Sequence, residues 1–161
     1  MDFIMECLAI GDLRDGEADP PEVDAILNLC EFEYSTTRIY RHLFFEDFVY
    51  LPDLSLIGQC TQFVREQIHL RHRVLVHCFA GVSRSTTICM AYLYECGMSL
   101  DEALALIQRV HPISAPQPEL LRSLHDWYFS KPQISSSSIK YKNSPAVLSK
   151  ENARRLLWTK E

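Results

Sequence analysis

Between residues 73 and 96 an apolar run, a short loop containing a glycine and a second apolar run follow one another. Residues 73–77 read Arg-Val-Leu-Val-His, which is typical of a buried, central β-strand. Residues 85–96 then have the composition of a buried helix, and Gly97 is a good residue to end it. A loop in this position leads into a helix N-terminus, where free N–H groups and the helix dipole favour an anion. The order of elements therefore predicts an anion-binding loop after a central strand.

The residues of the loop suit phosphate. Gly81 allows a backbone conformation that a Cβ would resist, and a short loop curled around an anion can direct several N–H groups inward. Arg84 lies six residues after Cys78, and its planar guanidinium matches two phosphate oxygens. We expect this environment to hold Cys78 largely as the thiolate, which is the nucleophilic form. The segment consists of His77, Cys78, Phe79, Ala80, Gly81, Val82, Ser83, Arg84 and Ser85.

These residue types predict phosphoryl transfer to sulfur. Cys78 is the expected nucleophile, and Arg84 is expected to hold the phosphate, so the reaction needs little beyond positioning and charge stabilisation. Ser85 is expected to donate its hydroxyl to the sulfur when the sulfur leaves in the second step. His77 is expected to orient the loop by hydrogen bonds and to help keep Cys78 ionised. We expect no metal and no cofactor, and none of the six cysteines forms a CxxC pair of the kind found in zinc ribbons.

The segment His-Cys-Phe-Ala-Gly-Val-Ser-Arg-Ser at 77–85 resembles the signature loop of protein tyrosine phosphatases. It is most similar to the loop of dual-specificity phosphatases of the mitogen-activated-protein-kinase phosphatase kind. The similarity extends over about residues 3–130 and includes Leu-Ala-Ile-Gly at 8–11 and Ala-Tyr-Leu at 91–93. The resemblance implies a mixed sheet of about four to five strands flanked by helices, with a shallow pocket. It also implies a protein phosphatase that acts on phosphotyrosine, with phosphoserine and phosphothreonine as further substrates.

Strand and helix patterns alternate along residues 1–130, which predicts one α/β or α+β domain around a central sheet. Residues 15–21 are expected to form a polar loop. From Lys131 onward the chain becomes basic and contains a run of serines, so residues 131–161 are predicted to be a tail, with a short amphipathic helix at 146–158. The expected strands are 4–10, 23–29, 41–45 and 73–77, and the expected helices begin at Pro52-Asp53, 85, 99 (a capping box with Glu102) and 118.

A general acid is needed because a tyrosyl or seryl oxyanion is a poor leaving group. Glu46, Asp47 and Asp53 all precede the loop at plausible distances. Asp47 lies thirty-one residues before Cys78, a spacing similar to that in dual-specificity phosphatases, and residues 44–47 resemble a segment of the phosphatase-and-tensin-homologue family. Asp53 has an ordinary role as a helix cap, and Glu46 as a solvated loop acid. Asp47 is the favoured acid, and the other two stay open.

Cys30 is a candidate redox partner of the nucleophile. Asn-Leu-Cys-Glu at 28–31 resembles a stretch of the same tensin-homologue family, whose cysteine forms a reversible disulfide with the catalytic cysteine. The resemblance implies a Cys30–Cys78 disulfide under peroxide. A buried core cysteine is an equally good interpretation of the same residue.

Charge is divided unevenly along the chain. Residues 1–130 hold nineteen Asp or Glu, nine Arg and no Lys, whereas residues 131–161 hold seven Lys or Arg and two Glu. An acidic surface repels polyanions, so nucleic acid and anionic membrane are not expected as partners. The basic tail is expected either to be disordered or to dock on an acidic surface, that of residues 1–130 or that of a partner. The N-terminus has acids where a signal peptide has bases, which favours the cytoplasm or nucleus as the location.

Other functions stay open beside a protein phosphatase. A phosphoinositide or RNA phosphatase would use the same chemistry, but Phe79 and Val82 stand where phosphoinositide phosphatases tend to have lysines. A weakly active phospho-binding module is a further alternative, although such proteins usually lose the nucleophile. The chain also departs from the family at Gln117, where dual-specificity phosphatases usually place an Asn that braces the signature loop. This departure affects the expected catalytic efficiency and leaves the expected reaction type unchanged.

Overall fold

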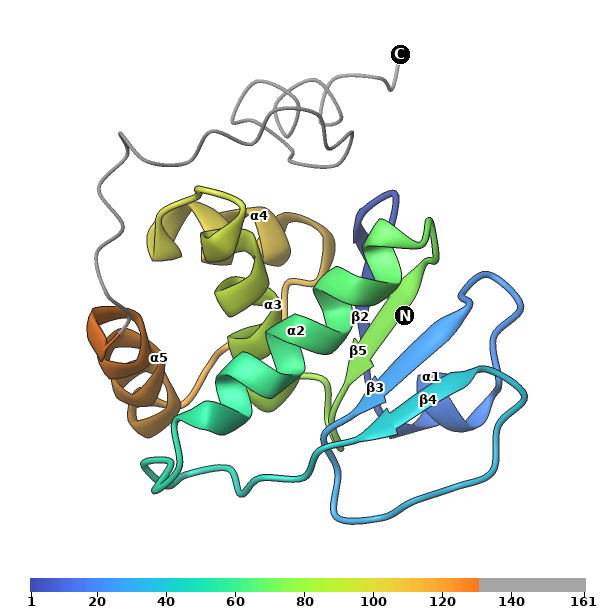
Figure 1. Cartoon of the computed structure of the whole chain (residues 1–161), viewed down its shortest axis with the longest axis horizontal. Helices are drawn as coiled ribbons and strands as arrows, with labels where there is room; N and C mark the ends of the chain where they lie inside the picture. The colour runs from blue at the N-terminus through green and yellow to red at the C-terminus, as the bar shows by residue number, and fades with distance from the viewer. Residues whose placement is uncertain (131–161) are drawn as a thin grey trace.

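The computed structural model describes residues 1–130, which form a five-stranded sheet between helices (Figure 1). The strand order is β1-β2-β5-β3-β4, in which β1 and β2 are antiparallel and the other three pairings are parallel. The predicted fold class, a mixed sheet flanked by helices, is confirmed. The elements are β1 (Asp2–Met5), β2 (Leu8–Gly11), α1 (Leu13–Glu17), β3 (Ala25–Asn28), β4 (Ile39–His42), α2 (Ser55–His69), β5 (Val74–His77), α3 (Arg84–Glu95), α4 (Leu100–Val110) and α5 (Pro118–Ser130).

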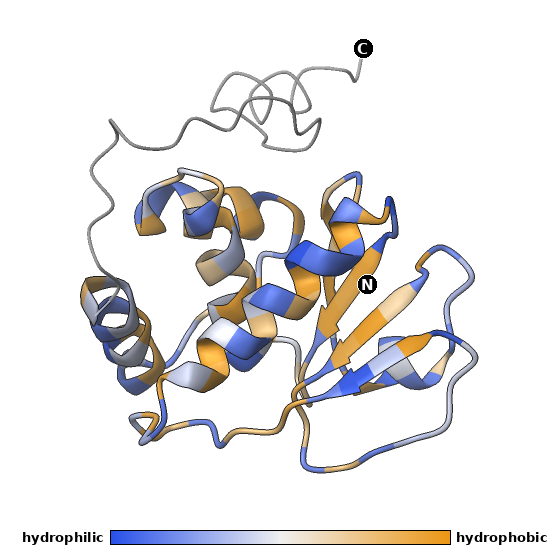
Figure 2. Ribbon diagram, in the orientation of Figure 1, coloured by the Kyte–Doolittle hydropathy of each residue, from blue (hydrophilic) through white to orange (hydrophobic). Residues whose placement is uncertain are grey.

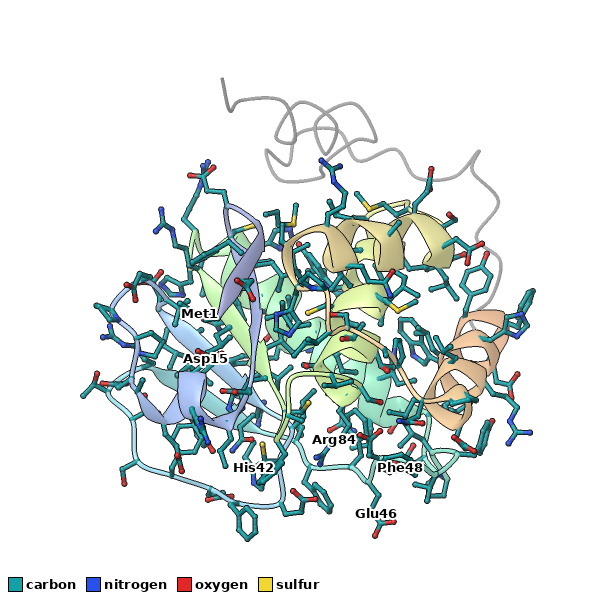
Figure 3. All side chains as sticks on the ribbon, turned by 180° about the vertical axis from the view of Figure 1, so that it is seen from behind. Met1, Asp15, His42, Glu46, Phe48 and Arg84 are labelled. Carbon is teal, nitrogen blue, oxygen red and sulfur yellow. The ribbon has the colours of Figure 1, made fainter. Side chains whose placement is uncertain are left out.

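The central strands are apolar on both faces, as expected for parallel strands that are covered twice (Figure 2). In β5, Val74 and Val76 join the large core beneath α2 and α3, whereas Leu75 points to a smaller cluster on the opposite face. α1 and the segment around Tyr34 cover that opposite face near His77 (Figures 1 and 3). The sheet is therefore sandwiched, and its loops are fixed from both sides.

Several local predictions are confirmed. The strand expected at 73–77 is β5, Val74–His77, which is central and fully buried, and the helix expected from residue 85 begins at Arg84. Ser99 and Glu102 form both bonds of the predicted capping box at the start of α4. Gly97 follows the C-cap of α3 with φ of +95°, the left-handed conformation that favours glycine there.

Two local predictions near the N-terminus are wrong. The single strand expected at 4–10 is a hairpin that turns at residues 6 and 7, where no Gly, Asn or Pro marks a turn. Within the loop expected at 15–21, residues up to Glu17 belong to the short helix α1. Reciprocal hydrogen bonds between Asp12 and Asp15 cap that helix, a pairing of two acids that the sequence analysis did not consider.

The strand expected at 41–45 lies earlier, at Ile39–His42, because its first residue pairs with Ala25 of β3. The chain therefore leaves the sheet before Phe44, which becomes part of a loop. The tail predicted at 131–161 and its helix at 146–158 lie outside the described residues. No helix within residues 1–130 combines the length and the apolar character needed to cross a bilayer.

Candidate active site

The carboxyl ends of the four parallel strands lie at one edge of the sheet, and segments following β3, β4 and β5 enclose a cavity of about 610 Å³. This edge is the usual ligand site in open α/β sheets. No three His, Cys, Asp or Glu side chains in the described part of the chain are grouped to hold a metal ion. The cavity is lined by Glu31, Phe44, Glu46, Asp47, Phe48, Cys78, Phe79, Ala80, Val82, Ser83, Arg84 and Gln117.

Cys78 lines this cavity directly after β5, and only 2% of its surface is exposed. Its sulfur lies 3.4 Å from the hydroxyl oxygen of Ser85 in the first turn of α3. The hydroxyl is therefore within reach to donate to the sulfur, in the place where the predicted role of Ser85 requires it. Because the residue is buried elsewhere and lines the cavity, a reactant approaches its sulfur through the cavity.

The loop after Cys78 carries a row of unused donors. The six backbone N–H groups from Phe79 to Arg84 donate to no other group within residues 1–130. Gly81 has φ of +69°, and a Cβ there would lie 2.9 Å from the carbonyl oxygen of Gly11, so both conformation and space require glycine. Unused amides at a helix N-terminus form a binding site for an anion.

Arg84 completes this site from the first position of α3. Its side chain is buried, and Nη1 donates to the carbonyl oxygens of Leu29 at 3.2 Å and Phe45 at 3.4 Å. The same nitrogen lies 3.4 Å from Oε1 of Glu31. Nε is also buried but has no partner among the described residues. A buried donor without an acceptor is costly, so this nitrogen favours an oxyanion in the cavity.

Of the three candidate acids, only Glu46 and Asp47 line the cavity. Oδ1 of Asp47 accepts a hydrogen bond of 2.7 Å from Ser83. Glu46 is exposed and points away from the body of the molecule (Figure 3). Asp53 accepts a hydrogen bond from the backbone N–H of Ser55 at 2.9 Å, and hydrogen bonds from Ser55 lower the pKa of the Asp53 carboxyl. This carboxyl is therefore ionised, and it already has a hydrogen-bond partner at the start of α2. The geometry favours Asp47.

His77 lies on the other side of the loop from the cavity. Its ring is buried, and burial lowers its pKa to about 4, so the imidazole is neutral near pH 7. Nε2 accepts from the Tyr34 hydroxyl at 2.6 Å, and Nδ1 faces the Cys78 carbonyl at 3.4 Å. His77 is thus placed to orient the loop by hydrogen bonds. It carries no positive charge with which to keep Cys78 ionised, and that part of the expectation is not supported.

Cys30 follows β3 and is fully buried. Its sulfur lies 3.8 Å from Nδ1 of His77. Burial, and then the neighbouring charge of Cys78, raise the pKa of Cys30 to about 12. Burial and the charge of Cys78 likewise raise the pKa of Cys89 on α3. Two protonated thiols therefore lie near Cys78, and every cysteine within residues 1–130 is free.

Residues 111–115, which no sequence pattern singled out, support the loop from behind. Nε2 of His111 donates to the Gly81 carbonyl at 2.9 Å, and Nδ1 lies 2.6 Å from the carboxylate of Asp2. The backbone N–H of Ala115 donates to the Val82 carbonyl at 2.9 Å. No local signal in the sequence around His111 indicated this role.

Gln117 supports the loop through its main chain. Its backbone N–H donates to the hydroxyl of Ser83 at 3.0 Å, and that hydroxyl donates in turn to Asp47. Because a backbone group makes this bond, the bond survives the exchange of Asn for Gln. Sequence reasoning also missed Glu31, whose contact with Arg84 joins loops far apart in the chain.

Comparisons with known proteins agree with this geometry. A probable dual specificity protein phosphatase of Dictyostelium discoideum is 34% identical over 105 residues, which are 63% of this chain and 26% of that protein. The crystal structure of human DUSP28 covers 79% of this chain and 94% of its own, at 19% identity and a TM-score of 0.73. The crystal structure of PTPMT1 in complex with PI(5)P covers 78% of this chain and 92% of its own, at 22% identity and a TM-score of 0.65. Both structures show likeness of fold.

The curated relatives are longer proteins, and the first three are covered over 26%, 35% and 40% of their length. The family model described as dual specificity phosphatase, catalytic domain, matches residues 22–130, which include the anion-binding loop, Asp47 and the supporting segment 111–117. The chain belongs to the family of dual specificity phosphatase catalytic domains.

Proposed function

We propose that the protein hydrolyses phosphotyrosine in proteins, with phosphoserine and phosphothreonine as further substrates, through a phosphocysteine at Cys78. One observation carries the proposal. Cys78 and Arg84 line one cavity at the sheet edge, and within residues 1–130 the six backbone N–H groups from Phe79 to Arg84 and the buried Nε of Arg84 have no acceptor. These donors suit the three non-bridging oxygens of a phosphoryl group, whose charge they stabilise during transfer.

The proposed reaction has two steps. The Cys78 thiolate attacks phosphorus in line with the leaving oxygen, which takes a proton from Asp47 as the phosphorus–oxygen bond breaks. Asp47 then removes a proton from water, which attacks the phosphocysteine and releases phosphate and the thiolate. Ser85 donates to the departing sulfur from 3.4 Å. Oδ1 of Asp47 is held by Ser83, which leaves Oδ2 to carry the proton.

Phosphoinositides are the alternative substrate class, and PTPMT1, a structural neighbour, has been solved with PI(5)P. The lining of the cavity supports a protein substrate instead. Arg84 is the single cationic side chain among the described lining residues, and Glu31, Glu46 and Asp47 are acidic. A head group that carries several phosphates needs more cations than this cavity offers.

A substrate panel tests the proposal. Wild type should release phosphate from p-nitrophenyl phosphate and phosphotyrosine peptides, and Cys78→Ser should lose at least about a thousandfold in rate while still binding peptide. Cys96→Ser, a substitution at the C-cap of α3, is the matched control and should retain activity. Faster release from phosphoinositides than from every peptide would refute a protein substrate. Peptide binding without any turnover by wild type would indicate a binding module.

We also propose that Cys30 protects the nucleophile from irreversible oxidation. Peroxide converts the Cys78 thiolate to a sulfenic acid, which the Cys30 thiol then attacks to form a disulfide and release water. Because burial raises the pKa of Cys30 to about 12, this closure should be slow at neutral pH and faster as pH rises. Dithiothreitol should restore activity to oxidised wild type and to Cys89→Ser, but less to Cys30→Ser. Equal recovery of all three would show that Cys30 is only a core residue.

A further inference from the structure

Three phenylalanines surround the mouth of the cavity and remain open to solvent. Phe44 is 38% exposed, Phe48 68% and Phe79 55%, and all three are lining residues. Phe48 has φ of +58°, a left-handed conformation that costs a non-glycine residue about 1 kcal/mol or more. Exposed aromatic rings gathered at a site mark a surface that becomes covered when a ligand binds. We call these three residues the aromatic rim.

The charge at the aromatic rim is negative. Glu31 and Glu46 are exposed lining residues, and Glu46 contacts no other charged group within residues 1–130. The positive charge of Arg84 is buried, and the bound phosphoryl group neutralises it. Figure 3 shows Phe48, Glu46 and Arg84 at the same edge of the molecule. Groups next to a bound phosphoryl group therefore face carboxylates and apolar rings.

Resting on the proposed function, we infer that the rim selects phosphoproteins with arginine or lysine beside the phosphorylated residue and rejects those with acidic neighbours. A guanidinium can stack on a phenylalanine ring while it pairs with a carboxylate, so arginine satisfies both features of the rim at once. An acidic neighbour would meet Glu46, which has no cation beside it among the described lining residues, and Glu31, whose partner Arg84 also holds the bound phosphoryl group. A single exposed charge pair changes affinity by up to about fivefold.

Three matched phosphotyrosine peptides test this inference, with arginine, alanine or glutamate on both sides of the phosphotyrosine. kcat/KM should fall in that order, with about 25-fold or more between the arginine and glutamate peptides at low salt. The difference in kcat/KM between the arginine and glutamate peptides should become smaller as the salt concentration rises, since salt screens exposed charges. Equal values, or a preference for glutamate, would overturn the inference. Hydrolysis of the alanine phosphotyrosine peptide that depends on Cys78 would show in either case that the proposed function stands.

Charge reversal locates the effect. Glu46→Lys should reduce the ratio of kcat/KM for the arginine peptide to kcat/KM for the glutamate peptide by about tenfold. The lysine repels the arginines of the peptide, which the glutamate attracts. Glu6→Lys makes the same change of charge in the β1–β2 turn, at the opposite end of β2 from the cavity, and should leave the ratio unchanged. If both variants narrow the ratio equally, the preference comes from net charge and the rim plays no part.

The aromatic part has its own test. Phe48→Ala should raise KM for the arginine peptide about fivefold more than for p-nitrophenyl phosphate, which is too small to reach around the mouth. An equal rise for both substrates would mean that Phe48 acts on the loop alone. The Phe48 ring would then have no part in the proposed recognition of peptides.

Discussion

The two loops that form opposite parts of the cavity are held in different ways. In the phosphate loop, residues 78–84, Cys78 and Arg84 are almost fully buried and segment 111–117 supports the backbone. In the acid loop, residues 43–53, Glu46 and Phe48 are exposed, and one side-chain bond from Ser83 reaches Asp47. Groups that stabilise charge work best when fixed in advance, whereas a loop that admits substrates and exchanges protons with water is less tightly held.

The largest effect should come from the acid itself. Asp47→Ala should lower kcat for phosphotyrosine peptides by about 10² to 10⁴ and have a much smaller effect on an activated aryl phosphate, since only poor leaving groups need the proton. Asp53→Ala should leave kcat unchanged and reduce stability slightly, because its carboxylate accepts a hydrogen bond from the backbone N–H of Ser55, the first residue of α2.

Glu46→Gln is the second control, since it removes the neighbouring carboxyl and keeps its size. Glu46→Gln should alter the preference for the arginine peptide over the glutamate peptide. It should leave the difference in kcat between poor and activated leaving groups as it is in wild type. A large loss of kcat in Asp53→Ala or Glu46→Gln, with little loss in Asp47→Ala, would assign the role of general acid to Asp53 or Glu46. The part of the loop that must be positioned for proton transfer would then be a different one.

Acid pH should lower the free energy of unfolding through His77, which lies next to the phosphate loop. Burial lowers the pKa of this histidine to about 4, whereas in the unfolded chain it titrates near 6.5. As pH falls from about 6.5 to 4 the unfolded chain binds a proton that the folded chain does not, so the free energy of unfolding falls by about 3 kcal/mol. Urea unfolding at pH 7, 5.5 and 4 measures this. His77→Gln should flatten the decrease, and an equally steep decrease in that variant would assign it to other groups.

Support of the phosphate loop from behind should be measurable at His111. His111→Ala leaves the Gly81 carbonyl without its donor, and we expect a loss of about 1 to 3 kcal/mol in stability together with weaker binding of vanadate. His125→Ala removes an exposed histidine from α5 and should change neither quantity. Unaltered vanadate affinity in His111→Ala would show that the loop holds its shape without this support.

The smallest effect should come from cutting the side-chain bond between Ser83 and Asp47, which joins the two loops beside the bond from Arg84 to the Phe45 carbonyl. Ser83→Ala removes the hydroxyl that donates to Asp47 and accepts from Gln117, and kcat for phosphotyrosine peptides should fall about tenfold. Ser123→Ala removes a comparable bond, from the backbone N–H of Leu51, where the acid loop meets α5. If both variants lower kcat equally, general anchoring of the acid loop matters and the bond at Asp47 has no special role.

The sequence by itself determined those features whose residues are neighbours in the chain. The strand, the loop and the helix at 73–96, the need for Gly81 and the capping box at Ser99 each depend on a few consecutive residues, so local patterns predicted them. The same local reasoning failed at the β1–β2 turn and at α1. There the usual turn residues are missing, and an unusual pair of aspartates caps the helix.

Tertiary structure alone decided which distant groups meet at the cavity. The order of the strands in the sheet places the end of β3 beside the end of β5 and the end of β4 next along the same edge, and this brings Glu31 to Arg84 and Asp47 to Ser83. Asp47 and Asp53 lie six residues apart, and only the path of the loop after β4 separates an acid in the cavity from a helix cap. Because such contacts depend on how the sheet aligns its strands, no local pattern could select them.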